Sequence, residues 1–324
     1  KLANKLKEKI ALFCNVEVDS VITAMDVKNI YEVPISLEKE GLAEIIVSKL
    51  GLSVEKPNLG PWERVVQGLS KPKFGEVDIA VVGKYVDLQD SYKSLTEALI
   101  HGGISNDVRV NIHWLDAGAL EDGEGLSDLN RYNGILVPGG FGERGIEGKI
   151  KAIQYARENK VPFFGICLGM HCAVIEFARS VVQLRKANSA EFAPNTPDPV
   201  IDLLYDQDIK GDKGGTMRLG EYCCQLRKNS NAFKAYGVRE VFERHRHRYE
   251  FNNRYRIQLE EAGLKFSGLS PNGNLVEIIE LESHPWFLAG QFHPEFKSSP
   301  MEPHPLFAAF IAHSRLRKNG EHTE

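Results

Sequence analysis

Residues 161–169 read Val-Pro-Phe-Phe-Gly-Ile-Cys-Leu-Gly, an apolar run that ends in a cysteine between two glycines. The run predicts a buried strand, a sharp turn and the start of a helix. This is the pattern of a nucleophile elbow, with cysteine in the place of serine. Gly165 and Gly169 leave room for a strained turn and for close approach of the backbone. We therefore expect the Cys167 sulfur to project above the edge of a sheet.

Apolar runs and helical patterns alternate around this strand. Strands are expected at 77–83, 108–114, 134–138, 162–166, 275–281 and 287–292, and helices at 91–101 and 146–158. Such alternation is typical of an α/β fold in which helices flank both faces of a central sheet. We predict a mostly parallel sheet over residues 77–318.

The preceding residues are organised differently. Residues 1–54 read as a small α/β piece with a strand at Ile10–Cys14 and a helix at Ser36–Leu50. Paired prolines and glycines make residues 55–76 a linker with a short helix in its middle, and residues 319–324 a tail. At 324 residues the chain is long enough for about two domains.

Composition narrows the class of protein. The net charge of −4 argues against a general nucleic-acid or membrane-surface role. The five cysteines form no C-x-x-C pair, so reduced thiols are expected, and no cluster has the spacing of a metal site. No apolar run approaches the roughly 20 residues that span a bilayer, and no signal-peptide core opens the chain. These features predict a cytoplasmic protein without a metal.

A histidine and an acid far downstream complete a possible catalytic set. Residues 291–295 read Gln-Phe-His-Pro-Glu, and in an extended segment residues i and i+2 point to the same face. Glu295 could then orient His293, and His293 could activate Cys167 as a general base and later act as a general acid. Two backbone amides, those of Leu168 and of Gly140 in Pro-Gly-Gly-Phe-Gly, are expected to form an oxyanion hole.

The combined motifs carry a family resemblance. The strings GICLG (165–169), VPGGFGERG (137–145) and QFHPEF (291–296) resemble class I glutamine amidotransferases. Residues 187–192, 214–220 and 243–250 are similar to CTP synthases within that class. The resemblance implies a flavodoxin-like fold, a Cys167–His293–Glu295 triad and a glutaminase domain at 77–318. Residues 1–54 would be the C-terminal remnant of the synthetase domain, whose ATP-binding P-loop motif is not found in this sequence.

The resemblance also assigns glutamine-binding residues. Arg248 would hold the α-carboxylate of glutamine and Glu191 its α-ammonium group, a charge pairing suited to a zwitterion. The family's remaining substrate contacts fall on Gly140, Leu168, Gly169, Met170 and His171. His171 departs from the family, which usually has glutamine there. An imidazole could supply a hydrogen bond but differs from an amide in size, geometry and charge state, so altered glutamine affinity is expected.

Further positions match nucleotide contacts of the family. CTP synthases are activated by GTP, and the matching positions are Lys84, Phe141 and Arg144. Lys9, Asp26 and Val27 match nucleotide contacts of the synthetase domain, a site that is incomplete in this sequence. Full-length relatives use ATP and Mg²⁺ and form homotetramers. This chain is expected to be a monomer or dimer whose glutaminase domain uses no cofactor.

The activity implied is hydrolysis of L-glutamine to glutamate and ammonia. In the full-length enzyme the ammonia would serve the ATP-dependent conversion of UTP to CTP. Two alternatives stay open at this point. One is a related γ-glutamyl hydrolase on the same fold, and the other is a catalytically silent regulatory or assembly module.

Overall fold

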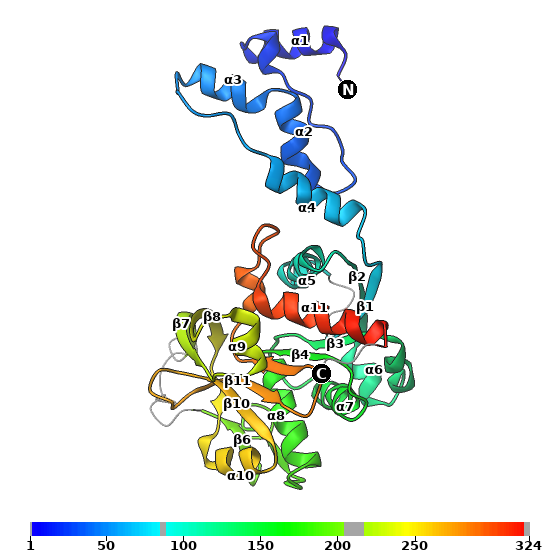
Figure 1. Cartoon of the computed structure of the whole chain (residues 1–324), viewed down its shortest axis with the longest axis vertical. Helices are drawn as coiled ribbons and strands as arrows, with labels where there is room; N and C mark the ends of the chain where they lie inside the picture. Colours follow the sequence, from blue (N-terminus) through cyan, green and yellow to red (C-terminus); the bar gives the residue numbers. More distant parts are fainter. Residues whose placement is uncertain (1, 85–88, 204–216, 321–324) are drawn as a thin grey trace. The chain divides into compact units, whose positions relative to one another are not determined.

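The computed structural model of the protein describes residues 2–84, 89–203 and 217–320. It divides into two compact units, Lys1–Lys73 and Phe74–Glu324, which are described separately (Figure 1). Gly214–Thr216, which belong to a motif given above, lie outside the described residues, as do residues 321–324 of the expected tail.

The first unit is helical. Its helices are α1 Asn4–Cys14, α2 Val33–Lys39, α3 Leu42–Lys49 and α4 Gly60–Ser70, with 3₁₀ turns at Val18–Ser20 and Ile30–Glu32. The predicted α/β character and the strand at Ile10–Cys14 are wrong, because this apolar run forms the end of α1. Periodicity does not separate a short apolar run in a helix from one in a strand. Only Ala11 of α1 is buried, so the run does not form a buried strand.

Part of the expected linker packs against this helical unit. Helix α4 lies within residues 55–76, where a short helix was predicted. The Trp62 indole N–H donates a hydrogen bond to the Tyr31 carbonyl, with Nε1 and O 2.5 Å apart. The boundary between the two compact units falls between Lys73 and Phe74, near the end of this segment.

The second unit is built on a nine-stranded sheet in the order β2-β1-β3-β4-β12-β11-β10-β7-β8. The first five strands are parallel: β2 Arg109–Asp116, β1 Glu76–Gly83, β3 Gly134–Val137, β4 Phe163–Ile166 and β12 Phe287–Gly290. The other four are antiparallel: β11 Val276–Leu281, β10 Leu264–Leu269, β7 Arg218–Leu226 and β8 Glu240–His247. The α/β prediction is confirmed, with a long antiparallel extension on one side. A smaller sheet joins β5 Ala187–Ser189, β6 Asp198–Asp202 and β9 Glu250–Phe251.

Helices cover both faces of the large sheet (Figure 1). On one face, an apolar core lies between the sheet and the helices α6 Ala117–Glu121, α7 Ile146–Glu158 and α8 Leu168–Ser180. On the other face, a second core lies between the sheet and the helices α5 Lys93–Ser105, α9 Asn231–Tyr236 and α11 Pro305–Lys318. A further helix of this unit, α10 Arg256–Glu261, packs on β10. Neighbouring residues of a strand serve opposite cores, since side chains alternate across a sheet. Phe163 packs on Phe287 with ring centroids 4.5 Å apart, whereas Phe164 packs on Phe307 at 5.2 Å.

This topology places three separate segments at one edge of the sheet. Strands β3, β4 and β12 are parallel neighbours, so their carboxyl ends meet at the same edge. The loop 138–145, Cys167 and residues 291–295 follow directly after these three strands. Ligands of open α/β sheets bind at such carboxyl ends.

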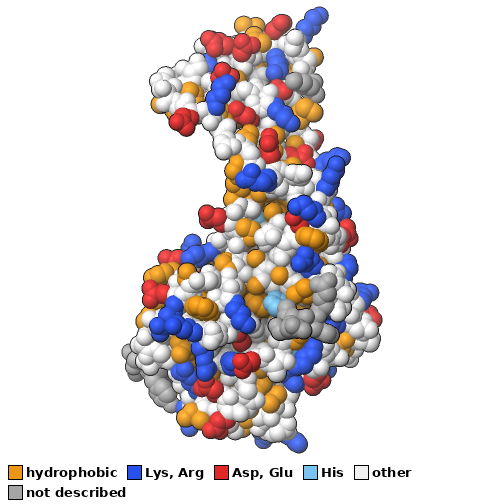
Figure 2. All heavy atoms as spheres, in the orientation of Figure 1, with side chains coloured by type: hydrophobic (Ala, Val, Ile, Leu, Met, Phe, Trp, Pro, Cys, Tyr) orange, Lys and Arg blue, Asp and Glu red, His pale blue; other side chains and the backbone are white. Residues whose placement is uncertain are grey.

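In the described part of the chain, no helix is long and apolar enough to cross a bilayer. On the face shown in Figure 2, basic and acidic side chains are interspersed.

Candidate active site

Cys167 occupies a strained turn between β4 and α8. Its backbone has φ 50° and ψ −101°, in a region that residues other than glycine rarely adopt. The turn is tied to the neighbouring strand, because the Cys167 N–H donates to the Gly290 carbonyl at 2.7 Å. A Cβ at Gly169 would lie 2.1 Å from the Val137 carbonyl oxygen, and one at Gly165 would lie 2.8 Å from the Ala289 Cβ. The requirement for small residues on both sides of the cysteine is thereby confirmed.

His293 and Glu295 form a hydrogen-bonded pair beside this turn. The His293 Nδ1 lies 2.8 Å from the Glu295 Oε1. The pair does not lie on an extended strand as expected, since Pro294–Lys297 forms a 3₁₀ turn that brings the two side chains together. Burial alone would disfavour the imidazolium, but hydrogen bonds with Cys167 and Glu295 raise the pKa of His293 to about 10. The arrangement favours a protonated imidazole facing the sulfur.

The loop after β3 approaches the triad at Gly139. A Cβ at this position would lie 2.7 Å from the His293 Cε1, so only glycine fits. The steric need for glycine in this loop thus lies at Gly139 and not at Gly140, the expected oxyanion donor. Gly140 does not have a positive φ, and a Cβ there would meet the Leu168 Cδ2 at 3.4 Å. Gly140 and Leu168 nevertheless line one cavity beside the sulfur, as an oxyanion site requires.

Lys84 holds this same loop, residues 138–145, through hydrogen bonds to its backbone. It is 7% exposed, and its Nζ donates to the carbonyl oxygens of Phe141 at 2.8 Å and Gly142 at 2.5 Å. Burial lowers the pKa of Lys84. The ammonium group of Lys84, a position that matches a GTP contact of the family, is thus directed at the loop backbone.

A cavity of about 270 Å³ opens at the sulfur. Seven of the residues predicted from the sequence line it together: Gly140, Phe141, Cys167, Leu168, His171, Glu191 and Arg248. Met217, His247 and Tyr249 also line it and were not predicted. All three lie inside motifs that suggested the family, but nothing in the local sequence distinguishes their side chains as facing a cavity.

Two opposite charges lie on the wall of this cavity. Glu191 accepts a hydrogen bond from the Gly142 N–H at 3.3 Å, which links it to the loop after β3. Burial raises the pKa of Glu191, while the Gly142 N–H, Lys84 and Arg248 act in the opposite direction. The buried Nε of Arg248 has no hydrogen-bond partner among the described residues. The cavity wall therefore carries one acidic and one basic side chain, Glu191 and Arg248.

The other predicted residues are placed away from the cavity surface. Gly169 and Met170 are buried inside the first turn of α8. Arg144 lies 3.8 Å from the Asp116 carboxylate at an exposed position, and Phe141, which does line the cavity, is 60% exposed. In the first unit, Lys9 is exposed on α1, and Asp26 and Val27 lie in an irregular segment.

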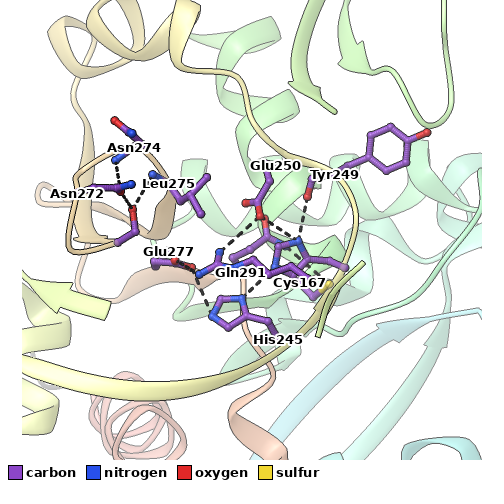
Figure 3. Close-up of polar contacts among 12 residues, drawn as sticks. Cys167, His245, Tyr249, Glu250, Asn272, Asn274, Leu275, Glu277 and Gln291 are labelled. Atoms are coloured by element: carbon purple, nitrogen blue, oxygen red, sulfur yellow. Dashed lines mark hydrogen bonds and ion pairs between the residues drawn. The ribbon is translucent and has the colours of Figure 1, made fainter. Parts of the chain in front are cut away.

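A buried polar network supports the cavity wall and was not predicted (Figure 3). Arg218 Nη2 lies 2.6 Å from Glu277 Oε1, and its Nη1 lies 3.5 Å from Glu250 Oε1. His245 Nδ1 lies 2.9 Å from His247 Nε2, and His247 Nδ1 lies 3.2 Å from the Tyr249 carbonyl oxygen. A carbonyl can only accept, so the proton of His247 sits on Nδ1 and that of His245 on Nδ1.

The network keeps both histidines neutral. Burial lowers the pKa of His245 and of His247, and the positive charge of Arg218 adds to this effect. Two neutral rings in a chain of directed hydrogen bonds fix the backbone on both sides of Arg248. Within the described residues, no group of three His, Cys, Asp or Glu side chains could hold a metal ion.

The chain is similar to proteins of known family. A family model described as "Glutamine amidotransferase class-I" matches residues 87–313, and one described as "CTP synthase N-terminus" matches residues 1–52. The chain is 58% identical to a CTP synthase of Carboxydothermus hydrogenoformans over 97% of its own length and 58% of that protein. It is 59% identical to a CTP synthase of Syntrophus aciditrophicus over 98% of its length and 59% of that protein.

A solved structure provides a third comparison. The glutaminase domain of Trypanosoma brucei CTPS, described with bound acivicin, is 40% identical with a TM-score of 0.70, and the match covers 76% of this chain and 96% of that one. The chain spans 58–59% of the length of the two CTP synthases above. The resemblance drawn from the motifs is confirmed, and the chain belongs to the class I glutamine amidotransferase family.

Proposed function

We propose that this chain hydrolyses L-glutamine to glutamate and ammonia, with Cys167 as the nucleophile. One observation carries the proposal: the Cys167 sulfur faces a His293–Glu295 pair on one side and opens on the other to a cavity lined by Gly140, Leu168 and two opposite charges. An acyl-transfer site needs these parts, and a zwitterionic substrate accounts for the charges.

The cavity residues select the substrate. Arg248 holds the α-carboxylate of glutamine through its guanidinium, and Glu191 accepts from the α-ammonium group. With both ends of the amino acid fixed, the side-chain amide reaches the sulfur. Uncharged amides lack both contacts and bind poorly, because the buried charges would stay unpaired.

The chemistry then runs in two steps. The Cys167 thiolate attacks the amide carbon, and the N–H groups of Gly140 and Leu168 stabilise the negative charge on the carbonyl oxygen. His293 gives its proton to the departing nitrogen, which leaves as ammonia, and a γ-glutamyl thioester remains. His293 next takes a proton from water, which attacks the thioester and releases glutamate while the sulfur is restored.

In a longer protein the ammonia would serve CTP synthesis. The relatives named above are CTP synthases, so we assign this chain to the glutamine-dependent half of the conversion of UTP to CTP, with ATP and Mg²⁺ acting on the synthetase side. GTP is proposed as the activator. The exposed Phe141 ring and Arg144 guanidinium suit a nucleotide, whereas the Lys84 amine, already bonded to two carbonyls, does not suit its phosphates.

The test is glutamate release from L-glutamine, with and without GTP. We expect Cys167→Ala to abolish release, and Cys14→Ala, which removes an exposed thiol in the first unit, to leave it unchanged. Release that persists in purified Cys167→Ala would refute the nucleophile. A γ-glutamyl peptide assayed in parallel separates the related hydrolase, since that enzyme would prefer the peptide.

A further inference from the structure

Gln291 is a buried residue that the proposed mechanism does not use. It follows β12, is fully buried, and its backbone N–H donates to the Glu277 carbonyl at 2.8 Å. Its side chain points at the nucleophile, with Nε2 3.9 Å from the Cys167 sulfur (Figure 3). That separation lies within hydrogen-bonding range for the large sulfur atom. The amide is thus the second polar group, after His293, that faces the thiol.

The other end of this amide is held by His171. The His171 Nε2 lies 2.8 Å from the Gln291 Oε1, and the imidazole is 3% exposed. Burial lowers the pKa of His171 to about 4, so at neutral pH the ring has a single N–H. The Tyr249 backbone also raises the pKa of this ring, but its carbonyl already accepts from the His247 Nδ1 at 3.2 Å, and the His171 Nδ1 makes no hydrogen bond of normal geometry among the described residues. The close contact of the ring, at 2.8 Å, is with the Gln291 Oε1, which can only accept. The ring proton therefore belongs on Nε2.

This assignment decides which end of the amide meets the sulfur. With the oxygen bound to His171, the NH₂ group faces Cys167. A flipped amide would bring its NH₂ against the imidazole N–H and its oxygen against the sulfur, two unfavourable contacts. A neutral N–H donor next to the sulfur favours the thiolate over the thiol, since only the thiolate is a strong acceptor.

We infer that Gln291 presents an amide N–H to the Cys167 thiolate and that His171 is a positioning residue, which fixes that amide the right way round. The inference rests on the proposed function, in which Cys167 is the nucleophile. On this inference, the histidine that stands at position 171 in place of the family's usual glutamine influences the reactivity of the Cys167 thiol, in addition to any contact with the substrate.

Other titratable groups surround the sulfur, and the test must separate them. His293 faces it from the turn after β12, and His247 lies beside His171. Glu191 and Arg248 lie across the cavity. The Gln291 amide does not titrate, so replacing it should move the whole pH profile of thiol reactivity without adding or removing a step.

The experiment measures alkylation of Cys167 by iodoacetamide as a function of pH, read by mass spectrometry on the full chain. Iodoacetamide reacts with the thiolate, so the midpoint of the profile reports how easily the sulfur ionises. Neither glutamine nor turnover is needed, and a chain without glutaminase activity would still give the result. Cys172 serves as an internal folding reporter, because it is fully buried on α8 and burial raises its pKa to about 11.

Two variants remove the contacts separately. Gln291→Met keeps the length of the side chain without its N–H, and we expect the midpoint to rise by about half to one pH unit, which is a roughly three- to tenfold lower ratio of thiolate to thiol at a given pH. His171→Phe should shift the midpoint in the same direction. His171→Gln, whose amide can donate to the Gln291 oxygen, should restore the original profile. Gln258→Met, an exposed position on α10, is the matched control.

The sign of the shift decides the question. An unchanged midpoint in Gln291→Met, or a lower one, would overturn the inference, because an amide oxygen facing the sulfur would have favoured the thiol. Equal profiles for His171→Phe and His171→Gln would overturn the role of His171. If His171→Phe exposes Cys172 to alkylation, Gln291→Met and His171→Gln, which keep their volume, decide alone.

Discussion

At the scale of single residues, Glu250 is buried in the polar network behind the cavity. Burial raises its pKa to about 8, and the nearby Glu277 adds to the effect while Arg218 opposes it. The folded chain therefore keeps this proton at pH values where the unfolded chain, with a pKa near 4.5, has lost it. The stability that the proton provides is complete below about pH 4.5 and is lost as the pH rises through about 8.

We expect Glu250→Gln to flatten this pH dependence. The free energy of unfolding, measured by urea titrations followed by circular dichroism, should fall between pH 5 and pH 8 in the wild type and fall less in the variant. Glu260→Gln is the control, because Glu260 is an exposed carboxylate 3.3 Å from Arg227. Parallel pH profiles of the wild type and Glu250→Gln would contradict the assignment.

At the scale of elements, the loop 138–145 depends on a residue of a different strand. Lys84 directly follows β1, and its two hydrogen bonds hold the carbonyls of Phe141 and Gly142. Those bonds hold the two residues that follow Gly140, and an oxyanion donor acts only when it is already oriented. Lys84 is therefore expected to support catalysis through the loop.

We predict that Lys84→Met lowers kcat for glutamine hydrolysis about ten- to hundredfold with a smaller change in KM, since the loop matters most in the transition state. Steady-state kinetics without GTP give the answer. Lys151→Met is the matched control: the Lys151 Nζ also donates to a carbonyl, that of Glu121 at 2.7 Å, on the exposed side of α7. A similar small loss in both variants would argue against a role for Lys84 in the loop.

At the scale of the whole molecule, every part of the candidate site belongs to one unit. Both apolar cores, the large sheet and the triad lie within Phe74–Glu324. The helices of residues 4–70 contribute no residue to either core. The second unit thus has the buried surface that an independent fold needs.

We expect a chain of residues 74–324 to fold and to keep glutaminase activity within a few-fold of the 324-residue chain. Thermal melting and glutamate release measure the two properties. A shorter chain that begins at residue 85 is the control, because it lacks β1, which lies between β2 and β3, and it should not fold. Aggregation of the 74–324 chain would show that the helical unit is needed for stability.

The sequence by itself determined the features that local chemistry controls. The elbow at Cys167, the strands that precede the site and the association of His293 with Glu295 follow from residues close together in the chain. A buried apolar run, a turn that needs glycines and a His-x-Glu spacing each leave a local pattern. The motifs also indicated the family, since several short strings together are far more specific than one.

Other features came only from the tertiary structure. The helix at Ile10–Cys14 could not be told from a strand, because a short apolar run fits both and packing decides. The bonds of Lys84 to the loop and of Gln291 to His171 join residues 57 to 120 positions apart. Only the strand order β1-β3-β4-β12 brings those residues together, and pairing between distant strands leaves no signal at any single position.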